Sequence, residues 1–210
     1  MIAAMLARPA VDAMVAALHA RGHAIVPEAF APDAIAALRG HALAQDAAGA
    51  FIPARTGRAL TAGRAPHEGA RGDRIAWLDA AAPAPCEAPV RAGLAALREA
   101  CNRELYLGIV DDELHYALYP PGAGYARHRD RFRDDDTRVL SVVLYLNAGW
   151  QPADGGALRL HLPAGAHTDI VPQGGTLVVF LADAFEHEVL PATRERASLT
   201  GWMRRRPRAR

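Results

Sequence analysis

The sequence feature that most constrains the fold is a pair of potential metal ligands, His128 and Asp130, with a third, His187, far downstream. In an H-x-D pair at a strand end, both side chains point to the same face, because side chains alternate along a strand with period two. His187 can join them only if the intervening chain leaves this point and returns to it. The chain therefore needs a fold that gathers distant strand ends in one place.

Short strand-like segments fill the interval between these ligands. They lie at Arg138–Asn147, Ala157–Leu162 and Thr176–Leu181, and breaks rich in Gly, Pro, Gln and Asp separate them. Strands at such regular spacing are typical of an antiparallel sandwich or jelly roll, whose open end can collect ligands from several strands. An extended run from Ala117 to Arg127 leads into the H-x-D pair, and a further strand is expected at Arg74–Leu78.

The N-terminal half has helical periodicity instead. Apolar residues spaced three and four apart predict one helix after Pro9 that ends near Gly22, and a second after Ala31–Asp33. A third helix is expected from about Cys86 to Leu105. We therefore expect an α+β fold in which N-terminal helices brace one face of the sheet.

Alternation within two strands points to an inward-facing polar pocket. In Arg138–Asn147, one face carries Leu140, Val142, Leu144 and Leu146, whereas the other face carries Val139, Ser141, Val143 and Tyr145. In the strand Arg196–Met203, Arg196 shares a face with Ser, Thr and Trp. A buried arginine needs a carboxylate or phosphate partner, for which its planar fork is suited. A surface arginine in an ion pair is the alternative interpretation of Arg196 taken alone.

Two imidazoles and one carboxylate form the facial triad that binds non-heme Fe(II) and leaves three coordination positions open. A second H-x-D pair, His167–Asp169, also precedes His187. It lies between Pro163 and Pro172, which favour a turn over a strand end, so we assign the metal site to His128, Asp130 and His187.

The length of the chain and its net charge indicate one domain without a preference for charged binding partners. The 210 residues fit one domain, taken as 1–204, with a basic tail at 205–210 that we expect to be disordered and solvated. With 24 Lys+Arg against 23 Asp+Glu, the chain has no overall attraction to nucleic acid or to a membrane. Cys86 and Cys101 follow helical periodicity and are expected to be buried thiols. The N-terminus lacks the pattern of a secretory signal, so a cytoplasmic location is expected.

The remaining histidines have no partner at ligand spacing, and we interpret them as surface or packing residues. They are His19, His23, His41, His67, His115 and His161. His115 differs in one respect, because it shares a strand face with Tyr119 and its side chain can therefore approach the site.

Taken in order, these residues resemble the Fe(II)- and 2-oxoglutarate-dependent dioxygenases, and within them the oxygen-sensing prolyl hydroxylases and their bacterial relatives. The resemblance covers roughly residues 20 to 204. Besides the triad and Arg196, it depends on the segments Arg71–Trp77, Tyr119–Tyr125, Tyr145–Asn147 with Trp150, Gly155–Arg159 and His187–Pro191.

The resemblance implies a double-stranded β-helix, a cupin-like jelly roll, and a protein prolyl 4-hydroxylase. Such an enzyme uses O2 and 2-oxoglutarate at Fe(II) and releases succinate and CO2, with ascorbate as a candidate reductant. The triad would hold the iron. The residues implied in 2-oxoglutarate binding are Arg196, Tyr145, Tyr119 and Thr200. The substrate would be a proline-containing protein or peptide, for which bacterial relatives suggest elongation factor Tu.

Other functions with the same site chemistry stay open to different degrees. A hydroxylase of a free amino acid or another small molecule is the main alternative, because the iron ligands do not report substrate size. Nucleic-acid demethylases with this iron site typically carry a second arginine six residues after the first, where this chain has Trp202. A non-catalytic cupin-like binding module or a zinc-bound scaffold would not need Arg196 beside the metal.

The segment Gly49–Ala70 has no periodicity and is rich in Gly, Ala, Arg and Thr. Long loops of this kind are often functional. We predict a mobile lid that closes over a peptide substrate, with Asp73 and Arg138 as candidate anchors for its exit.

Overall fold

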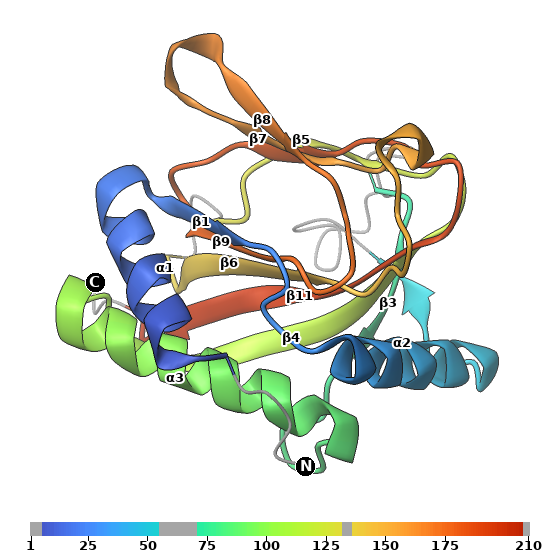
Figure 1. Ribbon diagram of the computed structural model, residues 1–210, viewed down its shortest axis with the longest axis horizontal. Helices are drawn as coiled ribbons and strands as arrows, with labels where there is room; N and C mark the ends of the chain where they lie inside the picture. The colour runs from blue at the N-terminus through green and yellow to red at the C-terminus, as the bar shows by residue number, and fades with distance from the viewer. Residues whose placement is uncertain (1–5, 55–70, 132–135, 208–210) are drawn as a thin grey trace.

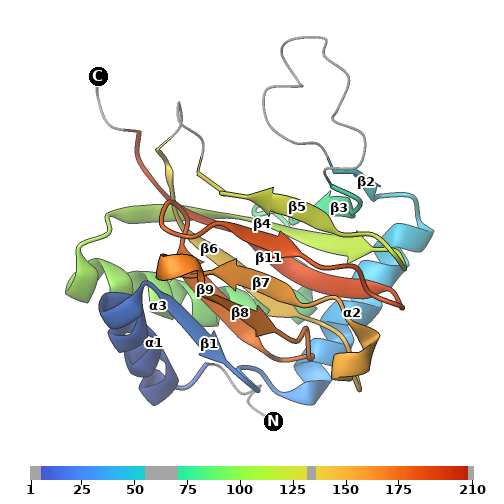
Figure 2. The same ribbon diagram turned by 90° about the horizontal axis from the view of Figure 1, so that it is seen from above.

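Two antiparallel sheets lie face to face, and three helices cover the outer face of the larger one (Figure 1). This arrangement comes from a computed structural model, which describes residues 6–54, 71–131 and 136–207. The smaller sheet lies over the inner face of the larger sheet, so that the two sheets enclose a second interior (Figure 2). The fold is the double-stranded β-helix expected from the sequence.

The helices are α1 (Arg8–Arg21), α2 (Pro32–Ala47) and α3 (Ala88–Leu105), close to the predicted positions. Helix α1 ends at Gly22, whose φ of 76° is left-handed and whose N–H donates to the Leu18 carbonyl. The prediction for Cys86 was wrong. It lies in the 3₁₀ turn Pro85–Glu87 before α3 and is partly exposed, whereas Cys101 within α3 is buried.

The larger sheet has seven strands, and the central ones are long. In spatial order they are β1 (His23–Val26), β9 (Leu177–Leu181), β6 (Arg138–Tyr145), β11 (Arg196–Arg205), β4 (Ile109–Tyr119), β3 (Arg74–Trp77) and β2 (Ile52–Pro53). The smaller sheet has four strands, in the order β5 (Tyr125–His128), β10 (His187–Val189), β7 (Leu158–His161) and β8 (His167–Ile170). Two further 3₁₀ turns lie at Pro152–Asp154 and Pro163–Gly165.

One predicted strand is in fact two. The run from Ala117 to Arg127 was expected to be continuous, but β4 ends at Tyr119 and β5 begins at Tyr125 in the other sheet. Pro120 and Pro121 follow the end of β4, and neither can donate a hydrogen bond to a neighbouring strand. The break lets the chain cross between sheets, and it places His128 opposite the larger sheet.

The two faces of the larger sheet have different roles. On β6, Leu140, Val142 and Leu144 are fully buried and pack with the helices, as the alternation predicted. Tyr145 and Val143 turn the other way, toward the smaller sheet. The helices therefore hold the larger sheet from outside, while its inner face is left to form the floor of a pocket.

Two local predictions were wrong. His167 and Asp169 lie in strand β8 and not in a turn, because this segment pairs with β7 in a hairpin that projects from the molecule (Figure 1). Arg205 does not belong to a solvated tail. It is the last residue of β11 and hydrogen-bonds Asp136. Residues 208–210 lie outside the described residues.

The predicted lid lies largely outside the described residues, which resume at Arg71 after residue 54. Its first part, Gly49–Ala54, includes the short strand β2. Of the predicted anchors for its exit, Asp73 is paired with Arg71. None of the helices in the described part of the chain is long and apolar enough to span a membrane.

Candidate functional site

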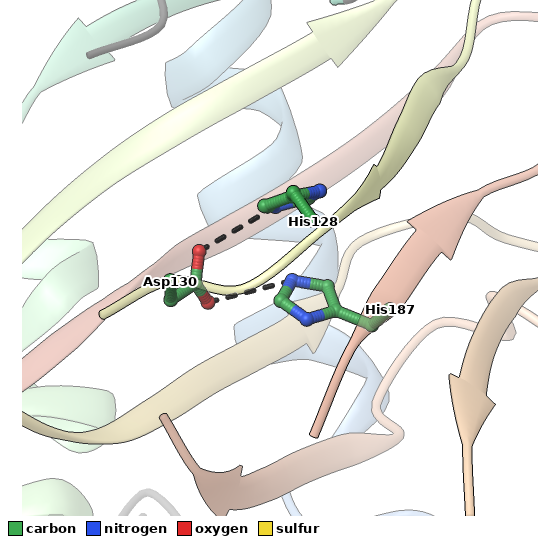
Figure 3. Close-up of side chains that lie close together, drawn as sticks. All are labelled: His128, Asp130 and His187. Carbon is green, nitrogen blue, oxygen red and sulfur yellow. Dashed lines mark ion pairs between the residues drawn. The ribbon is translucent and has the colours of Figure 1, made fainter. Parts of the chain in front are cut away.

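His128, Asp130 and His187 converge in one place, as Figure 3 shows. Their potential ligand atoms all lie within 4.8 Å of one another. The Nε2 atoms of His128 and His187 lie 3.5 and 3.4 Å from the two oxygens of Asp130. His128 ends β5, Asp130 follows it, and His187 begins β10, the strand that pairs with β5. The cluster thus joins adjacent strand ends of the smaller sheet.

Backbone carbonyls orient both imidazoles. Nδ1 of His128 lies 2.8 Å from the Ala126 carbonyl, and Nδ1 of His187 lies 3.5 Å from the Phe185 carbonyl. A neutral ring that donates its Nδ1–H outward presents the Nε2 lone pair to a metal. Burial lowers the pKa of His187 to about 4, although Asp130 opposes this shift, so the ring is neutral at pH 7.

The carboxylate of Asp130 is fixed by the larger sheet beneath it. Ser141, on the site-facing side of β6, donates a hydrogen bond of 2.7 Å to Oδ2. Arg138, at the start of the same strand, donates to the Asp130 backbone carbonyl at 3.1 Å. Burial raises the pKa of Asp130, but His187, His128 and the Ser141 hydroxyl outweigh it and hold this pKa well below its usual range. Asp130 is therefore an anionic ligand.

Aromatic rings brace the two histidines. Tyr125 stacks on His128 with ring centres 3.6 Å apart, and Phe180 meets His187 edge-on at 4.8 Å. Arg71 lies 4.8 Å from the centre of the Tyr125 ring and forms a bidentate pair with Asp73. Sequence analysis did not assign Arg71, Tyr125 or Ser141 to the site. Ser141 had a sequence cue in its place on the same face of β6 as Tyr145, and Arg71 and Tyr125 lie in segments that carry the family resemblance.

One cavity between the sheets is lined by the triad and by Arg196. Arg196, Tyr119 and Tyr145 form its second part, the arginine pocket. Arg196 has only 2% of its surface exposed, and its Nε donates to the Gly156 carbonyl at 3.0 Å. Its guanidinium carbon lies 5.2 Å from the ring centre of Tyr119 and 5.1 Å from that of Tyr145. No carboxylate among the described residues forms an ion pair with it. A buried cation with this surrounding requires an anionic ligand.

The hydroxyl of Tyr145 strengthens this conclusion. It is completely buried, and within the described part of the chain it has no hydrogen-bond partner. Burial raises the pKa of Tyr145 to about 12 despite the nearby Arg196, so the hydroxyl keeps its proton and can donate it to a ligand oxygen. The arginine and the phenol together fit one carboxylate.

The other two predicted ligand-binding residues line the cavity as well. Tyr119 is buried, and burial together with Asp73 raises the pKa of its phenol above its usual range. Thr200 lies on the cavity wall, but its hydroxyl donates to the Val142 carbonyl at 2.8 Å. Thr200 can therefore offer a ligand only the lone pairs of its oxygen.

The donor set fits the groups expected from the sequence. Two imidazoles and a carboxylate suit Fe(II) with open coordination positions, and the arginine pocket suits a carboxylate at the other end of the same ligand. His128, His187 and Arg196 all line one cavity between the sheets. The site can thus hold a metal ion together with a dicarboxylate.

Comparisons with known proteins agree with this geometry. The chain is 45% identical to a Pseudomonas putida prolyl-4-hydroxylase, over 93% of this chain and 99% of that one, with a TM-score of 0.83. It is 26% identical to a prolyl hydroxylase from Trichoplax adhaerens solved with a peptide fragment of the hypoxia inducible factor oxygen degradation domain. That match covers 92% of this chain and 88% of the other, also with a TM-score of 0.83.

Residues 114–204, which include the triad and Arg196, match the model of the 2OG-Fe(II) oxygenase superfamily. The fold also resembles the epimerase SnoN, solved with Fe3+, alpha ketoglutarate and a nogalamycin compound, at 13% identity and a TM-score of 0.67 over 95% of this chain and 85% of that one. At that identity only the fold is shared, so the fold by itself does not distinguish a peptide substrate from a small molecule.

Proposed function

This chain belongs to the 2OG-Fe(II) oxygenase superfamily, and we propose that its reaction is the 4-hydroxylation of a prolyl residue in a protein. The observation that carries the proposal is the convergence of the triad with the buried Arg196 in one cavity. The 45% identity to a prolyl-4-hydroxylase over almost the full length of both chains supports the choice of substrate.

Each group of residues has a defined task in such a reaction. His128, Asp130 and His187 would hold Fe(II). Bound Fe(II), 2-oxoglutarate and O2 supply the oxidative chemistry, in which 2-oxoglutarate yields succinate and CO2 and a C–H bond of the substrate becomes C–OH. The carbonyls behind both imidazoles and the Ser141 hydroxyl keep the ligands in place, so metal binding requires little rearrangement.

Arg196 and Tyr145 would bind the carboxylate of 2-oxoglutarate that lies far from the metal. Their burial excludes water from this end of the cavity, which strengthens the charge-assisted hydrogen bonds to the cosubstrate. The buried ring of Tyr119, 5.2 Å from the guanidinium carbon, also lines the pocket. The cosubstrate is thereby held in one orientation, with its reactive end toward the triad.

Two exposed apolar side chains lie on β3 and β2, the strands beyond β4 in the larger sheet. Trp77 on β3 is 47% exposed although its ring packs on His115, which lines the cavity, and Ile52 on the neighbouring β2 is 56% exposed. We propose that they form part of the surface that receives an extended peptide substrate. Arg138 lies 3.3 Å from the ring centre of Trp202, so this second tryptophan is fixed on the cavity wall.

The rival functions have weaker support. Trp202 is buried under Arg138 where a nucleic-acid demethylase would typically carry a second arginine. A non-catalytic scaffold gives no reason for an arginine and a phenol hydroxyl that both lack an anionic partner among the described residues. A hydroxylase of a free amino acid is the alternative that the substrate experiment below separates from ours.

Further parts of the proposal concern the cell. We expect ascorbate to keep the iron ferrous, and we expect the enzyme to act in the cytoplasm, where its thiols stay reduced. Elongation factor Tu is the first substrate to test, because the resemblance to bacterial relatives suggests it. Each of these is open to direct measurement with the purified protein and a bacterial lysate.

The decisive experiment is anaerobic incubation of a lysate with the Fe(II)-loaded enzyme, followed by O2 and 2-oxoglutarate. We expect mass spectrometry to find one added oxygen atom on a proline of a lysate protein, with succinate formed in step. His187→Ala is the control. Succinate formation stimulated by free amino acids, with no oxygen added to any protein, would replace our proposal with the small-molecule alternative.

A further inference from the structure

His115 is a buried histidine without a hydrogen-bond partner. Its side chain lines the cavity and is 1% exposed, and neither ring nitrogen bonds to any atom in the described part of the chain. The ring packs instead against two tryptophans, Trp77 at 4.7 Å and Trp202 at 5.5 Å between ring centres. Buried polar groups almost always have a partner, so this imidazole requires an explanation.

The register of the larger sheet locates His115 within the cavity. On β4 it pairs with Trp77 of β3 on one side and with Thr200 of β11 on the other. The next site-facing position along β11 is Trp202, which pairs with Ser141, the residue that holds Asp130. Within the sheet, His115 on β4 therefore lies between Ser141 on β6, which holds Asp130, and the exposed Trp77 on β3.

The same register separates His115 from the arginine pocket. Arg196 pairs with Tyr119, which lies four residues from His115 along β4. At about 3.3 Å per residue, the two positions are roughly 13 Å apart, which exceeds the length of a five-carbon dicarboxylate. His115 is consequently out of reach of the carboxylate that Arg196 would bind, and we take the group that it faces to belong to the substrate.

The ring's charge state restricts the ligand further. Burial lowers the pKa of His115 to about 3, with Arg71 and Arg138 acting in the same direction and Asp130 opposing them. A neutral imidazole offers one N–H donor and one acceptor nitrogen. The amide nitrogen of a prolyl residue has no hydrogen, so the backbone of the target proline itself offers a carbonyl acceptor and no donor.

We propose that His115 is a specificity-determining residue whose ring N–H donates a hydrogen bond to a substrate carbonyl oxygen that flanks the target pyrrolidine ring. This inference rests on the proposed prolyl hydroxylation. In the free enzyme the buried imidazole has no hydrogen-bond partner, which lowers the stability of the fold. A bound substrate would supply that partner. The two tryptophans hold the ring in place for this contact.

A purely structural role for His115 and a substrate-binding role predict different changes in thermal stability when the residue is replaced. If the ring serves only to pack against Trp77 and Trp202, its replacement lowers the thermal midpoint. If the ring instead binds the substrate, His115→Met replaces an unsatisfied buried group with an apolar side chain of similar size. The thermal midpoint of the substrate-free protein then stays equal or rises. The stability of the free protein is thus a readout independent of turnover.

The test measures binding in Zn(II)-loaded protein with 2-oxoglutarate, which is unreactive. The probe is a peptide spanning the proline that gains oxygen in the lysate experiment. We expect His115→Met to weaken peptide binding roughly tenfold, the effect of one lost hydrogen bond that leaves a carbonyl unpaired, and to leave 2-oxoglutarate affinity unchanged. His115→Gln keeps a neutral donor and should restore part of the affinity. His167→Met, on the exposed strand β8, is the matched control.

Thioamide peptides identify the carbonyl. Sulfur is a weak acceptor, so replacing the bonded carbonyl oxygen should weaken binding to wild type but not to His115→Met. Equal peptide affinity in wild type and His115→Met overturns the inference, as does a loss of 2-oxoglutarate affinity alone or a lowered thermal midpoint with unchanged binding. A wild-type protein that binds no prolyl peptide refutes the proposed function itself.

Discussion

The Ser141 hydroxyl donates a 2.7 Å hydrogen bond to Oδ2 of Asp130, the carboxylate oxygen that faces His187. Ser141 belongs to β6 in the larger sheet, whereas Asp130 follows β5 of the smaller sheet. This one bond ties the carboxylate ligand to the rigid floor that the helices support. The position of the metal site therefore depends on both sheets.

Ser141→Ala should weaken Fe(II) or Mn(II) binding by about 10- to 100-fold, the usual effect of removing an outer partner of a metal ligand. Titration of the metal-free protein measures this loss. Thr193→Ala, which removes an exposed hydroxyl, is the control and should not change metal affinity. Unchanged metal affinity in Ser141→Ala would show that the carboxylate is held without the hydroxyl.

His187→Ala should abolish stoichiometric metal binding and 2-oxoglutarate turnover. The ring supplies one of the three ligands found among the described residues, and its Nε2 atom faces the Asp130 carboxylate (Figure 3). The measurement is metal content per chain after dialysis. If the variant kept one metal ion per chain and normal turnover, our assignment of the ligands would be wrong.

Arg196→Ala should weaken 2-oxoglutarate binding by about tenfold or more, because hydrogen bonds to charged groups contribute roughly 1.5–3 kcal/mol. Metal affinity should hardly change, since Arg196 is not a ligand. Calorimetric titration of 2-oxoglutarate into Mn(II)-loaded protein tests the first statement, and titration of Mn(II) into the metal-free protein tests the second. Equal cosubstrate affinity in wild type and Arg196→Ala excludes this role.

Tyr145→Phe should have a smaller effect on 2-oxoglutarate binding, about threefold to tenfold, because it removes one neutral donor. It also removes a buried hydroxyl that has no partner among the described residues. The cosubstrate-free variant should therefore be as stable as wild type or more stable. A large loss of stability would mean that the hydroxyl serves the fold and not a ligand.

Much of the site followed from local sequence rules. Alternation along a strand placed Ser141 and Tyr145 on one face of β6 and Arg196 on the matching face of β11, and both faces line the interior between the sheets. The H-x-D spacing likewise reflects a strand end, since His128 is the last residue of β5. These features depend on neighbouring residues only.

The structural features that the sequence did not predict depend on contacts between residues that are far apart in the chain. The contact of Arg71 with Tyr125 joins segments that meet only in the folded chain. His167 and Asp169 form a strand because β7 lies alongside, which outweighs the flanking prolines. Arg205 lies in β11 and not in the expected tail, because its side chain hydrogen-bonds Asp136. Local propensity decides none of these three cases.

Gly156 lies under the arginine pocket, where an added side chain would disturb Arg196. Its φ is +70°, and an added Cβ atom would lie 2.9 Å from Ala192 Cβ, 3.1 Å from the Trp150 ring and 3.4 Å from Arg196 Cδ. Its carbonyl also accepts the Nε–H of Arg196. Gly156→Ala should therefore displace the guanidinium and weaken 2-oxoglutarate binding with little effect on metal affinity.

The control for this substitution is Gly165→Ala. Gly165 also has a positive φ, +79°, but nothing lies within 4 Å of its added Cβ. Both variants bear the cost of a left-handed alanine, so the difference between them isolates the clash with the pocket. Overpacking of this kind costs about 1–3 kcal/mol, and we expect it to appear in the Kd for 2-oxoglutarate of Gly156→Ala alone. If both variants bound 2-oxoglutarate equally well, the bare backbone of Gly156 would not be what positions Arg196.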